Sequence, residues 1–191
     1  MNKKILRYSL IGVLLLLLFI VFLPKKNKDE KPLDYKNVII EDKYNVSENL
    51  SENPGLKERY SLEDLEETKK IAIQFSKDIY SIDSKEPLKY PKSATNYTNK
   101  ALSERIIGIA KSTPLEIYKR EVTSVTVIEP IFEDYNSIIM WNIEVMADIY
   151  DENNNLIGRE KGVIDTVFTK EKDNYKVGEY SVKTYPKVIE D

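Results

Sequence analysis

The chain has 191 residues, with 29 basic and 32 acidic side chains and neither cysteine nor histidine. This composition excludes disulfides, thiol nucleophiles, Cys/His zinc sites and histidine general bases. Residues 1–28 carry six basic and no acidic side chains, so residues 29–191 hold 23 basic against 32 acidic ones. We therefore expect no direct nucleic-acid binding by the soluble part.

The first predicted element is a membrane anchor in residues 1–23. Three basic side chains precede an apolar run from Leu10 to Leu23, which Pro24 closes. Counted from Ile5 the run has about 19 residues, close to the length that crosses the hydrocarbon core of a bilayer. No small residue stands where a signal peptidase would cut, and a lipid-bearing cysteine is missing. A retained anchor is therefore favoured over a cleaved signal peptide.

Lysines flank both ends of the apolar run, so charge alone does not orient it. The short amino-terminal tail and the long acidic domain favour a single-pass protein of the cell membrane with an extracytoplasmic carboxyl-terminal domain. The lack of cysteine in an exported domain, with abundant Lys, Asn, Ile and Tyr, indicates a low-GC Gram-positive bacterium.

Residues 24–60 are predicted to be a linker, because Lys, Glu, Asn, Ser and Pro dominate them. Within this linker, Val38-Ile-Ile40 could dock onto the domain or form a short strand. The folded domain is expected over residues 61–185, followed by a tail at residues 186–191.

Two helices begin the predicted domain. Ser61 provides a capping-box-like start, and apolar residues at helical spacing then predict an amphipathic helix over Leu62–Tyr80. Thr98 or Asn99 can cap a second helix that runs to about Lys111.

Beyond the second helix the apolar pattern changes to a period of two, which indicates strands. Asn-rich turns separate the later ones. The predicted strands are residues 120–130, Ser137–Asp151, Leu156–Lys170 and Tyr175–Lys183. Helices followed by strands indicate an α+β domain, in which the helices pack on the concave face of a curved four-stranded antiparallel sheet.

Together these segments resemble a known family. They are Ala72-Ile-Gln-Phe75 with Tyr80, Val122–Val127, Met140–Val145, the Tyr150–Gly158 hairpin and Tyr175-Lys-Val177. Over residues 62–183 the chain resembles the nuclear-transport-factor-two-like, cystatin-like cone fold. With its single anchor it is similar to the VirB-type assembly factors of type IV secretion systems and to their Gram-positive, TcpC-like conjugation counterparts.

The resemblance implies a non-catalytic scaffold subunit of a conjugative channel, without cofactors. Its outer domain would form homo-oligomers and bind other subunits of the channel. Two alternatives stay open. One is a surface-anchored cone-fold ligand-binding protein or enzyme, and the other is an accessory domain in wall synthesis or sporulation.

Three strand carboxylates are candidates for catalysis: Glu144, Asp148 and Asp165. A carboxylate in an apolar mouth would gain the raised pKa that a general base needs. The polar face of a half-exposed strand is the simpler and favoured interpretation. The segment Asp151–Asn155 is rich in oxygen ligands, but it lacks the glycine and final glutamate of a calcium loop. We expect a hairpin turn there and no metal site.

Aromatic residues provide the candidate partner interface. Trp141, the single tryptophan, lies on the apolar side of the longest strand, and we expect it in the core. Five tyrosines fall near helix ends and loops, where amphipathic rings suit a protein interface. For any single one of them, ordinary half-burial is the favoured interpretation. They are Tyr80, Tyr90, Tyr97, Tyr118 and Tyr135.

Overall fold

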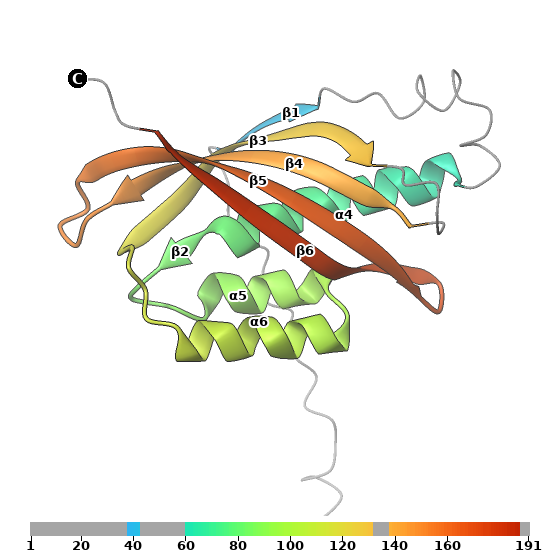
Figure 1. Cartoon of the computed structure of the whole chain (residues 1–191), viewed down its shortest axis with the longest axis horizontal. Coiled ribbons are helices and arrows are strands. Elements are labelled where there is room, and N and C mark those ends of the chain that lie inside the picture. The colour runs from blue at the N-terminus through green and yellow to red at the C-terminus, as the bar shows by residue number, and fades with distance from the viewer. Residues whose placement is uncertain (1–37, 43–59, 132–137, 188–191) are drawn as a thin grey trace, which may run out of the picture. The chain divides into compact units, whose positions relative to one another are not determined.

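The structure, a computed structural model, describes residues 38–42, 60–131 and 138–187 (Figure 1). The predicted anchor at residues 1–23, most of the predicted linker and most of the predicted tail lie outside these ranges. None of the helices within the three described ranges is both long and apolar enough to cross a bilayer.

The described residues form an α+β domain with a curved, open sheet. Its elements are β1 (Ile39–Asp42), α4 (Leu62–Tyr80), β2 (Ile82–Asp83), α5 (Lys89–Ala94), the 3-10 turn η1 (Thr95–Tyr97), α6 (Lys100–Ser112), β3 (Lys119–Ile131), β4 (Met140–Tyr150), β5 (Leu156–Glu171) and β6 (Asn174–Lys187). The strand order is β1-β3-β4-β5-β6, and β2 pairs with β3 outside this path. The helices α4, α5 and α6 lie on the same side of the sheet (Figure 1).

The sheet differs from the prediction of four antiparallel strands, because six strands form it and one pairing is parallel. β1 runs parallel to β3, with Ile39 opposite Ser124. β2 pairs antiparallel to β3, with Ile82 opposite Arg120. Both added strands are too short to show a periodic pattern, and β1 joins β3 across more than 80 residues of sequence. Ile39 and Ile40 of the segment Val38-Ile-Ile40 thus lie in a strand, one of the two outcomes expected for that segment.

Side-chain caps fix where the longer helices begin. The Ser61 hydroxyl accepts a hydrogen bond from the Asp64 amide at 3.0 Å, so α4 begins at Leu62 as predicted. The Asn99 side chain accepts from the Leu102 amide at 2.8 Å and caps α6. Of the two predicted caps for the second helix, Asn99 is therefore the one used.

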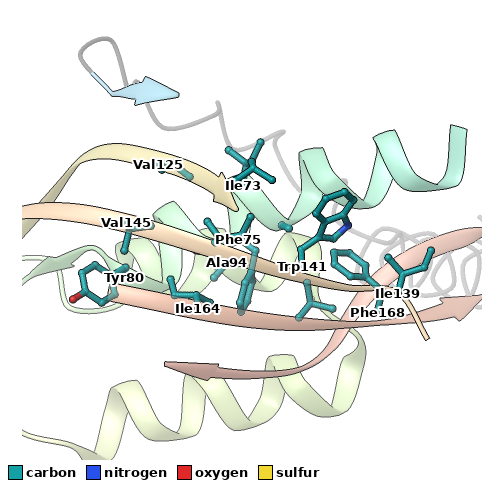
Figure 2. Packing of buried hydrophobic residues seen from close by; sticks show 14 of the residues in the cluster. Ile73, Phe75, Tyr80, Ala94, Val125, Ile139, Trp141, Val145, Ile164 and Phe168 are labelled. Carbon is teal, nitrogen blue, oxygen red and sulfur yellow. The ribbon is translucent and has the colours of Figure 1, made fainter. Parts of the chain in front are cut away.

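The core lies between α4 and one face of the sheet, which we call the inner face; the opposite face is the outer face. Along β4, Trp141, Ile143, Val145 and Ala147 are fully buried on the inner face, as the alternation predicted. Figure 2 shows Phe75 of α4 and Trp141 among the side chains that fill this layer. The Trp141 indole N–H donates to the Thr68 hydroxyl at 3.0 Å, so a polar group deep in the core is satisfied.

A β-bulge alters the pattern of β3. The register shifts between Val122 and Ser124, so that Val122 faces Ala147 while Val125 faces Val145. Because of the extra residue, Val122 and Val125 lie on the same inner face. An uninterrupted alternation, as predicted from the sequence, would have placed them on opposite faces.

Candidate functional site

The candidate site lies at the end of the sheet where α4 stops and β3 starts. There, Arg120 of β3 binds the carboxyl end of α4, because its Nε–H donates to the Tyr80 carbonyl oxygen at 2.5 Å. Its Nη1 lies 2.5 Å from Oε1 of Glu160 on β5. The guanidinium carbon also stacks 4.0 Å from the centre of the Tyr80 ring. One side chain thus connects the helix, β3 and β5.

This cluster is largely withdrawn from solvent. Tyr80 is 1 % exposed and Glu160 is 8 % exposed, so the ion pair is well shielded from water. The Tyr80 hydroxyl lies near Glu160 and Thr184 without a well-formed hydrogen bond. Burial, together with the negative charge of Glu160, raises the pKa of Tyr80 to about 12. The phenol therefore stays protonated throughout the physiological range.

Three lysine–tyrosine pairs come from segments next to this cluster in the chain or the sheet: the loops beside β2 and β3, helix α5, and the paired ends of β3 and β4. The Lys85 ammonium lies 5.7 Å from the centre of the Tyr118 ring. The corresponding distance is 5.1 Å for both Lys89 with Tyr90 and Lys119 with Tyr150. We call Lys85, Lys89, Tyr90, Tyr118, Lys119 and Tyr150 the lysine–tyrosine rim.

Backbone pairing brings the rim together from distant parts of the sequence. Lys119 of β3 is opposite both Asp83 of β2 and Tyr150 of β4. The amide of Ser84 donates to the Tyr118 carbonyl oxygen at 2.8 Å, which holds the segment after β2 against the start of β3. The rim thus stands on paired strands and on α5, whose geometry is fixed by the fold.

Acidic side chains are interspersed with the rim. The Lys119 ammonium lies 2.7 Å from a Glu121 carboxylate oxygen and donates to the Asn154 side chain at 3.4 Å. Burial raises the pKa of Tyr90, and Glu121 and Asp83 raise it further. Burial likewise raises the pKa of Tyr150. The rim therefore offers neutral phenol groups and charges of both signs, a mixture that suits another protein better than a phosphate backbone.

The five tyrosines predicted for a partner interface lie in different environments. Tyr90 and Tyr118 both belong to the rim, Tyr90 beside Lys89 and Tyr118 beside Lys85. Tyr80 does not reach the surface, because the last turn of α4 directs its ring onto the inner face; it is a core residue rather than an interface residue. Tyr97 packs partly against the core near Asp78 and is not a member of the three lysine–tyrosine pairs. Tyr135 lies outside the described residues.

Tyr150 belongs to the rim although the sequence did not single it out. It is the last residue of β4, and its neighbours in the chain form a turn. A tyrosine at a strand end next to a turn resembles Tyr118, which precedes β3 directly. The position of Tyr150 at a strand end beside a turn is thus the feature of the sequence that could have identified it as a rim residue.

The three candidate carboxylates lie on the outer face, and each has a partner. Asp148 lies 2.7 Å from Nε of Arg159, and Glu144 pairs with Lys161. Asp165 accepts hydrogen bonds from Asn142 Nδ2 at 2.7 Å and from the Ser181 hydroxyl at 3.1 Å. They are thus on the polar face of the strands, away from the apolar interior that a buried general base needs.

Asp151 organises the turn between β4 and β5. Its Oδ1 accepts from the amides of Asn153 and Asn155 at 2.9 and 2.8 Å, and its Oδ2 accepts from Asn155 Nδ2 at 2.9 Å. These bonds, led by the Asn155 side chain, lower the pKa of Asp151. Asn154 has a φ of 62°, so the predicted hairpin turn is confirmed. In the part of the chain that the structure covers, no group of three acidic side chains is placed to hold a metal.

No protein-family model and no curated protein matches the chain. A solved structure described as "Ntf2 like protein involved in plasmid conjugation" is similar to it, with a TM-score of 0.46 and 15 % sequence identity. The match covers 66 % of this chain and 52 % of that one, so this chain spans about half of its length. A TM-score below 0.5 does not establish a common fold, and the fold is therefore assigned from its own strand order and helix placement.

Proposed function

We propose that this chain is a non-catalytic scaffold subunit of a Gram-positive conjugative type IV secretion channel. Residues 1–23 would anchor it in the cell membrane, and the extracytoplasmic domain would associate with itself and bind other subunits. The lysine–tyrosine rim is the observation that carries the protein-binding part of this proposal. The conjugation system is inferred from the resemblance of residues 62–183 to TcpC-like proteins.

The rim has the properties of a docking surface. Tyrosine is enriched at protein interfaces, because its ring buries much area while the hydroxyl keeps a polar contact. Tyr90, Tyr118 and Tyr150 are already half-buried, so ordering them against a partner costs little side-chain entropy. Tyr90 is on α5, Tyr150 ends the paired strand β4, and the Tyr118 carbonyl is bonded to the Ser84 amide, so the fold holds all three in place.

A membrane anchor would strengthen binding between subunits through such a surface. Subunits held in one membrane have a high effective concentration, so weak contacts between domains are enough to build an assembly. Scaffolding through many weak contacts also needs no catalytic residue. The outer-face carboxylates, which are paired to cations or amides, fit that role.

The test is deletion of the gene in a plasmid-bearing strain, with transfer frequency and growth measured together. Transfer should fall while growth is unchanged, and the wild-type gene should restore it. A variant with Tyr90→Ala, Tyr118→Ala and Tyr150→Ala should fail to restore transfer. Tyr175→Ala is the matched control, because Tyr175 also stacks on a lysine, Lys170 at 4.9 Å, but belongs to β6.

Unchanged transfer after deletion would contradict the proposal. A growth or sporulation defect with normal transfer would favour the accessory role in wall synthesis or sporulation. Protease treatment of intact protoplasts tests the topology. The domain should be degraded, and a protected domain would place it in the cytoplasm instead.

A second candidate function, binding of a small ligand at the inner face, is favoured by two buried hydroxyl groups. Ser76 Oγ and Tyr80 Oη have no hydrogen-bond partner among the residues described here, and they lie one helical turn apart on α4. Buried polar groups normally find a partner, which a ligand or water could supply. Native mass spectrometry of the purified full-length protein tests this. A small molecule retained by the wild type and lost in Tyr80→Phe would support it, and the absence of any adduct would exclude it.

A further inference from the structure

β6 has an open edge along most of its length. One side of β6 pairs with β5. On the other side, in the described structure, Thr98 forms a bridge with Val177, and the Asn99 amide donates to the Val177 carbonyl oxygen at 3.1 Å. From Gly178 onward that edge is open, and Val182 and Tyr185 are 40 % and 51 % exposed. A long exposed strand edge presents unpaired backbone N–H and C=O groups, which favour pairing with another strand.

The residue pattern along this edge is complementary to a second copy of the same segment that runs in the opposite direction. The segment reads Glu179-Tyr-Ser-Val-Lys183, with opposite charges at its ends, apolar side chains next to them and a small residue in the centre. Glu179 and Lys183 are both exposed, and neither makes an ion pair within the described ranges. Two such segments placed antiparallel would therefore match charge with opposite charge.

We propose that β6 pairs antiparallel with β6 of a second copy of this chain, about a two-fold axis at Ser181. Glu179 of each copy then faces Lys183 of the other, and Tyr180 faces Val182. A two-fold axis perpendicular to the sheet keeps the two inner faces on the same side. The proposed function includes self-association of the domain, and this pairing identifies β6 as the surface through which it occurs. The inference therefore rests on the proposed function.

The charges select this register over its neighbours. Residues that face each other across such an axis must lie on the same face of the sheet, so the axis passes through a residue. An axis at Glu179 or at Lys183 would set two like charges against each other, which is unfavourable. An axis at Tyr180 or Val182 would leave both charges without a partner across the junction. Only an axis at Ser181 pairs both.

The lack of cysteine in the chain allows a direct test. Directly opposed residues of an antiparallel pair have Cα atoms about 4.5–5.5 Å apart. That spacing falls in the range of a disulfide. In Ser181→Cys, the two cysteines would face each other at the axis, so mild oxidation of membranes that contain the full-length protein should give a covalent dimer.

Thr184→Cys is the matched control on the same exposed strand. In the proposed register it faces Gly178, and its counterpart in the other copy lies about 20 Å away along the strands. It should give little dimer. No dimer with Ser181→Cys, or equal yields from both variants, would overturn the proposal.

Charge reversal provides a second test that does not depend on one cysteine position. In the Ser181→Cys protein, either Glu179→Lys or Lys183→Glu should lower the dimer yield several-fold, because like charges then face each other. The double variant restores both pairs and should restore the yield. If the double variant cross-links no better than the single ones, the register is wrong.

Transfer assays separate this inference from the proposed function. If transfer depends on the gene but Ser181→Cys does not cross-link, the β6 pairing is wrong and the scaffold function stands. If Ser181→Cys cross-links but transfer does not depend on the gene, the pairing stands and the conjugation function is wrong.

Discussion

The ring of Tyr80 fills the space that a side chain at position 162 would need. A Cβ atom on Gly162 would lie 2.4 Å from Cε2 of Tyr80, closer than real Cβ contacts allow. The Arg120 guanidinium stacks on the same ring, so the ring cannot move without disturbing the buried ion pair. Gly162 is thus required by the close approach of the end of α4 to β5.

We expect Gly162→Ala to lower the free energy of unfolding by about 1–3 kcal/mol, the usual cost of overpacking a core. Gly158→Ala is the control on the same strand, because its Cβ would meet Ile149 only at 4.0 Å, an ordinary contact. Its effect should be smaller than about 0.5 kcal/mol. Urea unfolding of the full-length protein, followed by the fluorescence of the single tryptophan, measures both. Equal stability of the two variants would show that the Tyr80 ring can relocate.

Stability should fall at alkaline pH because of Tyr80. Its pKa of about 12 in the folded state exceeds the ordinary value of 10.0, so the unfolded chain loses this proton first as the pH rises. The contribution is therefore complete below pH 10 and declines as the pH rises from 10 to 12. This difference in pKa corresponds to at most about 3 kcal/mol.

Tyr80→Phe isolates this effect, since other tyrosines and the lysines titrate in both proteins. The stability difference between wild type and Tyr80→Phe should be constant from pH 7 to 9 and should shift in favour of the variant above pH 10. Urea midpoints at pH 8 and pH 11 give the comparison. A difference that does not change with pH would mean that the phenol titrates normally.

Loss of the acceptor for Trp141 should be costly. Thr68→Val keeps the shape of the side chain but leaves the buried indole N–H without its partner at 3.0 Å. We expect a loss of about 1–3 kcal/mol in unfolding free energy. Thr68→Ser retains the hydroxyl and should be closer to wild type. A Thr68→Val protein as stable as Thr68→Ser would show that the hydrogen bond contributes little.

Two of the ion pairs that β5 makes should differ in their contribution to stability. Glu160→Gln leaves the Arg120 charge, on a side chain only 13 % exposed, without its counter-charge, and we expect a loss of about 3 kcal/mol. Asp148→Asn removes the partner of Arg159, whose side chain is 49 % exposed, and should cost less than about 1 kcal/mol. Thermal unfolding at low and high salt checks both, since only the exposed pair should depend on salt.

Local signals in the sequence predicted much of the fold. The Ser61 cap and the apolar spacing after it gave the bounds of α4, and the alternation around Trp141 gave the buried face of β4. These features could be predicted because each depends on residues within one element. The turn at Asn154 followed in the same way from its tolerance of positive φ.

The features that sequence did not predict depend on contacts between elements. β1 has four residues and becomes a strand only because β3 is beside it. The bulge after Val122 changes which residues face inward without changing the composition of the strand. Tyr80 and Tyr118 look equivalent in sequence, yet the helix buries one while the other stacks on Lys85 at the surface.

β1 also has a mechanical consequence. It is the first described strand, and it is joined to the sheet only by its parallel pairing with β3, from Ile39 opposite Ser124 to Asp42 opposite Val127. A tension applied to the chain ahead of Ile39 reaches β1 before it reaches α4. Because the hydrogen bonds cross between the strands, a pull along β1 loads them together in shear, whereas a pull across it breaks them one after another. The direction of the tension would therefore set how much force the first strand withstands before it detaches.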